Sequence, residues 1–293
     1  MAAVNAASRP TRAQIRRRRW IAAGVLALVL GAIAYLMLAP ESERERAEAR
    51  GYQVAHLEIE SEAVGEELGV NAIVPPRAGP SGKRSLLVFL HGRGGSEETF
   101  NDAVLRGLPR LHGQGPVVAF PDGGEHGYWH DRTEGDWETY VMEEAIPAVV
   151  RRFGVDPERI AIGGISMGGF GAYSIALHNP GRFCAVGGHS PALWFEGGET
   201  APGAFDDAAD FERNDVVGAV QSDPEAFGDT RVWIDYGDED PFLPYDKGFV
   251  AAMEAGDADF TDHAWPGAHE GGYWDEHWPD YQRFYAEALA DCG

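Results

Sequence analysis

The chain has 293 residues, of which 44% are hydrophobic and 24% are charged, a composition typical of a globular protein with a hydrophobic core. The net charge of the chain is −23, but it is unevenly distributed. Residues 1–40 contain six arginines and no acid, so residues 41–293 carry a net charge of −29. A surface this acidic repels nucleic acid, which we therefore exclude as a partner of the main domain.

Residues 20–38 form an uncharged apolar run that predicts a transmembrane helix. At ~1.5 Å per residue this run reaches about 28 Å, close to the thickness of a bilayer core. Arg16 to Arg19 precede it, which predicts a cytoplasmic segment at 1–19 and a catalytic domain outside the cytoplasm. A cleaved signal peptide is the alternative, although residues 37–40 lack an A-x-A site. Residues 39–50 are charged and read as a short tether or a frayed helix.

From residue 51 to 293, β-rich runs alternate with helical stretches, which predicts one domain with a mostly parallel sheet flanked by helices. The opening runs at 52–61 and 69–75 read as an antiparallel pair, and 85–91 is apolar enough for a strand buried on both faces. Helices are expected at 97–106, at 139–153 with a kink or division at Pro147, and at 167–179. Periodicity fails over 191–229, which we interpret as a cap-like insertion.

Gly164-Ile165-Ser166-Met167-Gly168 matches the G-x-S-x-G pattern of a nucleophile on a sharp strand-to-helix turn. The context supports this interpretation, because an apolar strand precedes the motif and a helix rich in small residues follows it. Ser166 is therefore the candidate nucleophile.

His91-Gly92-Arg93-Gly94-Gly95 follows an early strand and is typical of a loop that forms an oxyanion hole. We expect the oxyanion donors to be the backbone amides of Met167 and Arg93, with Gly94 as the alternate. The Arg93 side chain is then free to face the substrate. We interpret His91 as a structural residue that bonds the loop backbone.

A serine nucleophile needs an imidazole base and a carboxylate that orients it, in the chain order Ser, acid, His for this fold. Asp240 follows a predicted strand and is the candidate acid, with Asp238 as its rival, whereas Asp235 falls within the strand. His269 lies in a loop of small residues and is the candidate base. Its rivals are His263, inside the last predicted strand, and His277, near the final helix.

Aromatic and histidine residues close to these motifs are candidate substrate contacts. Besides Arg93 we name Trp129, His130 and Trp274, although aromatic residues often serve packing alone. His126 and His130 have the i, i+4 spacing of some zinc sites, but the local sequence reads as loop, and we expect no metal. Whether Cys184 and Cys292 pair is left open, because sequence separation does not determine spatial distance.

At these motifs the sequence resembles the esterase D family of α/β-hydrolases, which includes S-formylglutathione hydrolases, feruloyl and acetyl esterases and mycolyltransferases. The resemblance rests on HGRGG at 91–95, FPDGG at 120–124, GISMGGFGA at 164–172, YGDEDPF at 236–242 and PGAHEGGYWDEHW at 266–278. It implies an α/β-hydrolase fold, a Ser166, Asp240 and His269 triad, and no cofactor. The acidic stretch 196–229 and the N-terminal run depart from the family pattern.

These observations predict a serine carboxylesterase that hydrolyses a small-molecule or glycan ester through an acyl-enzyme. The same residues would serve an acyltransferase acting on a cell-envelope lipid or sugar. A non-catalytic surface binding protein built on a hydrolase scaffold is the third hypothesis.

Overall fold

The computed structural model describes residues 42–78, 82–99, 101–107, 115–256 and 259–292, together with scattered positions between 12 and 29. The chain divides into two units, Met1–Ser42 and Glu43–Gly293. Most of the predicted membrane span at 20–38 lies outside the described residues, as do most of 1–19 and residues 39–41. Among the residues that are described, none belongs to a helix with the length and apolar character needed to span a bilayer.

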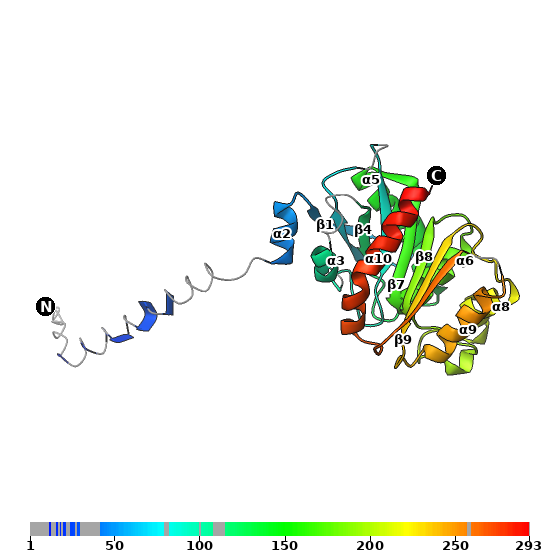
Figure 1. Ribbon diagram of the computed structural model, residues 1–293. Coiled ribbons are helices and arrows are strands. Elements are labelled where there is room, and N and C mark those ends of the chain that lie inside the picture. The colour runs from blue at the N-terminus through cyan, green and yellow to red at the C-terminus, as the bar shows by residue number, and fades with distance from the viewer. Residues whose placement is uncertain are drawn as a thin grey trace. The chain divides into compact units, whose positions relative to one another are not determined.

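The second unit is built on an eight-stranded sheet with the strand order β1-β2-β4-β3-β7-β8-β9-β10 (Figure 1). Only β1 with β2 and β2 with β4 are antiparallel, and the remaining neighbours are parallel, which confirms the mostly parallel sheet expected from the sequence. The strands are β1 (Gln53–Glu60), β2 (Glu67–Val74), β3 (Arg84–Leu90), β4 (Val117–Pro121), β7 (Val155–Ser166), β8 (Ala185–Pro191), β9 (Arg231–Gly237) and β10 (Phe260–Trp265).

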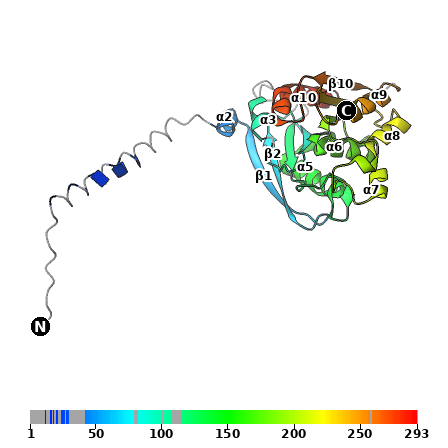
Figure 2. The same cartoon turned by 90° about the horizontal axis from the view of Figure 1, so that it is seen from below.

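Helices cover both faces of this sheet. One face carries α2 (Glu43–Ala49), α3 (Asn101–Gly107) and α10 (Gly271–Asp291). The other carries α4 (Trp137–Thr139), η2 (Tyr140–Ala145), α5 (Ile146–Phe153), α6 (Met167–His178), α7 (Ala208–Arg213), α8 (Val216–Ser222) and α9 (Leu243–Met253). Figure 2 shows α3 and α10 on one side of the sheet and α5 and α6 on the other. A two-stranded hairpin of β5 (Asp131–Arg132) and β6 (Gly135–Asp136) lies outside the main sheet.

Strand β3 illustrates why the sheet is buried on both faces. Leu86, Val88 and Leu90 pack into the core beneath α5 and α6, whereas Leu87 and Phe89 pack into the core beneath α10. A strand whose alternate side chains enter two apolar layers has no polar face. The continuous apolar run at 85–91 is the sequence signature of this position.

Two predicted helices differ from the structure in detail. The helix expected at 97–106 begins only at Asn101, because the Ser96 amide donates to Thr99 Oγ1 at 2.8 Å and closes a turn before it. The helix expected at 139–153 is divided, since a π-helical turn ends at Ala145 and α5 follows it. Pro147 stands in the first turn of α5, directly after the π-helical turn in which the Ile146 amide bonds to the Val141 carbonyl oxygen.

The cap-like insertion predicted at 191–229 is in part an ordinary layer of the fold. It contains a short helix, η3 (Gly197–Glu199), followed by α7 and α8. Val216, Val217 and Val220 of α8 belong to the core beneath α6. The acids that hid this pattern cap the helices, because Asp207 accepts from the Asp210 amide and Asp215 from the Gly218 amide.

Candidate active site

The turn between β7 and α6 presents Ser166 in a strained backbone conformation. Its φ of 51° and ψ of −118° lie in a region of backbone conformation that residues other than glycine rarely adopt. The turn is so tight that a Cβ on Gly164 would lie 2.5 Å from the Gly168 backbone, and a Cβ on Gly168 would lie 2.1 Å from the Leu90 carbonyl oxygen. The glycines of the G-x-S-x-G pattern are therefore required by close backbone approach.

Ser166, His269 and Asp240 form one chain of hydrogen bonds. His269 Nε2 lies 2.8 Å from Ser166 Oγ, and His269 Nδ1 lies 2.9 Å from Asp240 Oδ2. A carboxylate can only accept, so Nδ1 carries the proton and Nε2 is left to accept from the serine hydroxyl. This is the tautomer that a general base needs.

Parallel topology brings these residues together from distant parts of the chain. Ser166 ends β7, Asp240 lies three residues beyond β9, and His269 lies between β10 and α10. The carboxyl ends of parallel strands meet at one edge of a sheet, which is where the loops of an α/β fold build a site. Of the three residues predicted from their places after strands, His269 lies within hydrogen-bonding distance of both Ser166 and Asp240.

The Asp240 carboxylate is held in the form that can orient the base. Its side chain is fully buried, and Oδ1 accepts from the Phe242 amide at 2.8 Å. Burial acts to raise the pKa of Asp240, but the hydrogen bond and charge of His269 outweigh it, so the net pKa lies below its ordinary value. Asp240 is accordingly ionised at neutral pH.

The rival acid and bases have other partners. Asp238 Oδ1 accepts from the Gly267 amide at 3.0 Å and so ties the acid turn to the loop that carries His269. His263 lies within β10 and packs against Trp233 and Trp265. His277 lies on α10 and stacks on Trp265 with ring centroids 3.8 Å apart. The structure thus places each rival in a packing or bracing position.

The loop at 91–95 lies directly against the nucleophile. A Cβ on Gly92 would lie 3.3 Å from Ser166 Cβ. The Gly94 amide is already bonded to the Glu125 carbonyl oxygen at 3.0 Å, which removes the alternate oxyanion donor. Met167 is the first residue of α6, a position whose amide has no intrahelical acceptor. Of the three candidate amides, those of Arg93 and Met167 have no hydrogen-bond acceptor in the described part of the chain.

His91 braces this loop, as the sequence interpretation anticipated. Its Nδ1 lies 2.9 Å from the Gly92 carbonyl oxygen, and its Nε2 accepts from the Gly123 amide at 2.9 Å. Both ring nitrogens are therefore occupied by backbone groups. Trp129 Nε1 donates to the His91 carbonyl oxygen at 3.2 Å and braces the loop from behind.

The four predicted substrate contacts separate into two pairs. Arg93 is exposed, with its guanidinium beside the Tyr128 hydroxyl, and the Trp274 ring meets His269 edge to face at 5.1 Å. Trp129 and His130 are instead completely buried. Trp129 fills the space beside Gly171, and His130 Nε2 lies 3.1 Å from Asp210 Oδ2. Burial and these bonds argue against substrate contact by Trp129 and His130, which are packing residues.

Sequence reasoning missed an aromatic wall next to His269. The Phe242 ring lies 5.1 Å from the His269 ring, and Trp194 packs on Phe242 with centroids 5.7 Å apart. The position of Phe242, two residues after Asp240, was a usable signal. Trp194 gave none, because it lies in the stretch where periodicity fails.

Cys184 and Cys292 form a disulfide with their Cα atoms 5.8 Å apart. The bond joins the end of α10 to the residue that precedes β8. The pairing that the sequence left open is therefore settled by proximity in the fold.

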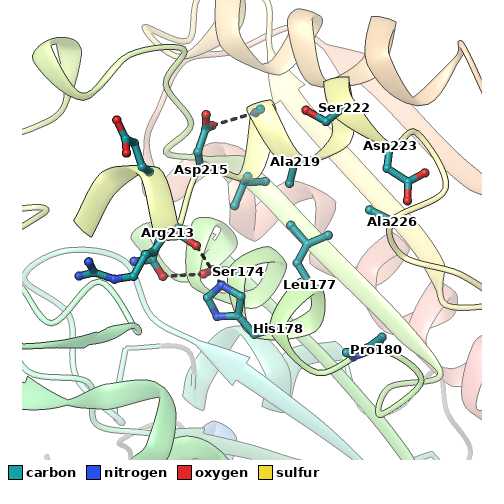
Figure 3. Close-up of a pocket in the computed structure, with 14 residues that line it drawn as sticks. Ser174, Leu177, His178, Pro180, Arg213, Asp215, Ala219, Ser222, Asp223 and Ala226 are labelled. Carbon is teal, nitrogen blue, oxygen red and sulfur yellow. Dashed lines mark hydrogen bonds between the residues drawn. The ribbon is translucent and has the colours of Figure 1, made fainter. Parts of the chain in front are cut away.

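A separate cavity of about 630 Å³ lies among α6, α7 and α8 (Figure 3). Ser174 lines it and stands eight residues beyond Ser166 on α6, a distance of roughly 12 Å along the helix axis. The polar groups that Figure 3 draws bonded are satisfied by each other, as in the Ser174–Asn214 pair. In the described ranges, no group of three or more His, Cys, Asp or Glu side chains is arranged to hold a metal ion.

Comparison with known proteins identifies the relatives of this site. The Esterase family model, described as "Putative esterase", matches residues 61–285. The chain belongs to this esterase family. The family is of the esterase D type, as the sequence resemblance implied.

Curated relatives match parts of this esterase. S-formylglutathione hydrolase of Bos taurus is 32% identical over 199 residues, which cover 58% of this chain and 69% of that protein. Esterase MT1326 of Mycobacterium tuberculosis is 29% identical over 140 residues. That match covers 45% of this chain but only 31% of the mycobacterial protein, so the esterase spans about a third of that relative.

Solved structures show the fold. A ferulic acid esterase superposes with a TM-score of 0.70 at 21% identity, covering 81% of this chain and 98% of that one. An S-formylglutathione hydrolase from Agrobacterium tumefaciens gives a TM-score of 0.68 at 24% identity, covering 82% and 96% of the two chains. The predicted α/β-hydrolase fold is confirmed.

Proposed function

We propose that this esterase hydrolyses a carboxylic ester through an acyl-enzyme formed on Ser166, with His269 as general base and Asp240 as the residue that orients it. The observation that carries the proposal is the continuous chain of hydrogen bonds from Ser166 Oγ through both nitrogens of His269 to Asp240. Such a chain activates a hydroxyl that is a weak nucleophile by itself.

In the first step Ser166 Oγ bonds to the ester carbonyl carbon, and its proton passes to His269 Nε2. Negative charge develops on the carbonyl oxygen, towards which the amides of Met167 and Arg93 would donate. Collapse breaks the bond to the alcohol, which leaves with the proton from His269. Water then gives a proton to His269, attacks the acyl group and releases the acid, and Ser166 regains its proton. Asp240 stays ionised throughout.

We further propose a small aryl or short-chain ester, or a glycan ester, as the substrate class. Phe242 and Trp274 both meet the His269 ring at 5.1 Å and supply flat apolar surface beside the reacting atoms. The exposed Arg93 guanidinium is available to a polar group of the substrate. One structural neighbour is a ferulic acid esterase in complex with ferulic acid. That neighbour is the reason for including aryl esters in the proposed substrate class.

The test compares the full-length chain with Ser166→Ala. The wild-type protein should hydrolyse p-nitrophenyl acetate and react with a fluorophosphonate probe, and the variant should lose roughly 10³-fold or more of the rate. Equal rates in the two proteins would reject the esterase mechanism. Absence of labelling in a folded wild-type protein would favour the non-catalytic binding hypothesis.

Acyl transfer to an envelope lipid or sugar uses the same residues and differs only in the acceptor. It is tested by adding an alcohol to the esterase reaction and measuring how the acyl group is divided. Transfer product in excess of free acid would establish a transferase, and free acid in excess would establish a hydrolase.

We also propose that the catalytic unit lies outside the cytoplasm on a single N-terminal membrane helix at 20–38. The Cys184–Cys292 disulfide supports an oxidising compartment. Trp20, Leu26 and Leu28 of the apolar run are exposed by 70%, 59% and 76%. Protease added to intact cells should digest the catalytic unit of a membrane-bound, full-length chain. Protection of the unit in intact cells would overturn the proposed orientation.

A further inference from the structure

A buried carboxylate lies between the sheet and α10, apart from the reacting residues. Asp235 of β9 is fully buried, yet both of its oxygens are satisfied. Oδ1 accepts from the hydroxyls of Tyr273 and Tyr281 at 2.9 and 2.8 Å. Oδ2 accepts from Trp233 Nε1 at 2.7 Å and from His189 Nδ1 at 2.6 Å. Four donors converge on one side chain within an otherwise apolar layer.

The Asp235 cluster extends through His189 to Tyr285. His189 gives its Nδ1 proton to Asp235, so its Nε2 accepts from the Tyr285 hydroxyl at 3.0 Å. That hydroxyl lies in a slot between β7 and β8, because a Cβ on Gly163 or Gly187 would come within 1.8 or 2.1 Å of it. The two glycines explain how a tyrosine hydroxyl reaches the middle of the sheet.

The Asp235 cluster touches the loop that carries His269 through Tyr273, whose amide donates to the Glu270 carbonyl oxygen at 3.1 Å. Tyr273 lies in the first turn of α10, and its ring would be 2.9 Å from a Cβ on Gly267. Gly267 stands two residues before His269, and its amide donates to Asp238 in the turn that leads to Asp240. The His269 loop is therefore held on one side by the turn at 238–240 and on the other side by Tyr273.

Asp235 holds Tyr273 in place by a hydrogen bond of fixed direction. Burial and the nearby charge of Asp235 raise the pKa of Tyr273, so its hydroxyl is protonated and donates. The alternative, an unpaired carboxylate in this apolar layer, is strongly disfavoured. A buried polar network whose members are all hydrogen-bonded makes the surrounding core rigid.

We propose that Asp235 and Tyr273 are positioning residues that hold the His269 loop in the geometry required for proton transfer from Ser166. The inference rests on the proposed function, since it concerns how that base is placed. The two residues act through the loop and do not touch the reacting atoms. Displacement of a catalytic group by about 1 Å costs of order 10²-fold in rate, so such placement has a measurable effect.

The chain offers a matched pair of variants, Tyr273→Phe and Tyr281→Phe. Each removes one hydroxyl from the same oxygen of Asp235, at 2.9 and 2.8 Å, and each keeps its ring. Tyr281 stands eight residues, or roughly 12 Å of helix, beyond Tyr273 and away from His269. Asp235→Asn is a poorer test, because an amide nitrogen facing the donors would endanger folding.

Full-length variants are compared by melting temperature, by kcat and KM for p-nitrophenyl acetate, and by the rate of fluorophosphonate labelling. Both variants should lose similar thermal stability. Tyr273→Phe should lower kcat and the labelling rate by about 10-fold or more with KM within 2-fold, and Tyr281→Phe by less than about 3-fold. Tyr140→Phe, which removes a buried hydroxyl without a partner in the described part of the chain, is the control expected to match wild type.

Equal losses of kcat and labelling in Tyr273→Phe and Tyr281→Phe would overturn the inference, because a purely structural cluster would treat the two alike. An increase in KM alone would also overturn it. Failure of the proposed function gives a different result: either the wild-type protein does not turn over the ester, or its rate is unchanged in Ser166→Ala.

Discussion

At the scale of single residues, backbone strain gathers around the nucleophile. Among the described residues, the non-glycine residues with positive φ are Tyr128, Trp129, Ser166 and Ser190. Ser190 precedes Pro191, which pairs with Ser166 across β7 and β8, and Trp129 braces the loop at 91–95. Strain of this kind persists only where surrounding contacts enforce it, and it is concentrated at functional sites.

Gly168→Ala should be strongly harmful, because its Cβ would meet the Leu90 carbonyl oxygen at 2.1 Å and backbone cannot move aside cheaply. We expect a loss of about 1–3 kcal/mol or more in the free energy of unfolding, with most of the esterase activity. Urea unfolding measures the first quantity. Gly198→Ala is the control, since a Cβ there meets nothing within 4 Å. Equal stability of the two variants would contradict the assigned clash.

Asp240→Asn should lower kcat by about 10⁴-fold, because an amide facing Nδ1 stabilises the tautomer that cannot accept the Ser166 proton. KM should change little, since the Asp240 side chain is buried behind His269. Asp238→Asn, which alters only the brace to Gly267, should cost far less. Steady-state kinetics decide between the two acids, and a larger loss in Asp238→Asn would reverse their roles.

At the scale of elements, α6 joins the nucleophile to the helical layer and its end is held by an ion pair. His178 Nδ1 lies 2.7 Å from Glu138 Oε2 of α4, and Nε2 lies 3.2 Å from the Arg213 carbonyl oxygen. Both partners accept, so the imidazolium satisfies them best. The hydrogen bond to Glu138 is the main cause of the raised pKa of His178.

This ion pair gives stability a dependence on pH. The folded pKa of His178 is raised above its unfolded value, so the pair's contribution is complete below pH ~6.5 and is lost as the pH rises through the folded pKa. His178→Gln should therefore destabilise the protein more at pH 5.5 than at pH 9. The difference should be small, below about 1 kcal/mol, because the pair is partly exposed. Urea midpoints at the two pH values measure it, and a pH-independent loss would argue against the charged pair.

The elements also show what the sequence could reveal. Strands and their order along the chain follow from apolar runs such as 85–91, and parallel strands imply that Asp240 and His269 meet Ser166 at one edge. Helix α8 escaped notice because its 7 residues are too few for helical periodicity. Nothing local in the sequence signals that Trp129 is completely buried, so its proximity to the motifs was misleading. The Asp235 cluster joins β8, β9 and α10, so no single stretch reveals it.

At the scale of the whole molecule, one covalent bond closes a long stretch of the fold. Cys184 and Cys292 are separated by 108 residues, and a cross-link over roughly 100 residues restricts the unfolded chain by about 4 to 5 kcal/mol in the entropy model. Cysteine spacing alone could not reveal the pair, because it depends on where α10 ends against the sheet.

Reduction of the disulfide should lower thermal stability markedly. We expect dithiothreitol to cost about 2–5 kcal/mol in the wild-type protein and nothing in the Cys184→Ser, Cys292→Ser double variant. Thermal unfolding with and without the reductant measures both. A melting temperature unaffected by reduction in the wild-type protein would show that the bond adds no stability.

The two ends of α10 are held by different chemistry, so they respond differently to the redox state of the surroundings. The first turn, next to the base, is held by tyrosine and carboxylate, which do not respond to redox conditions. The last turn is held by sulfur. Protein made in a reducing cytosol should therefore keep Ser166, His269 and Asp240 in their relative positions, and it should hydrolyse ester at low temperature. On warming, it should fail earlier than the same chain folded in an oxidising space, with the helix loosening from its far end.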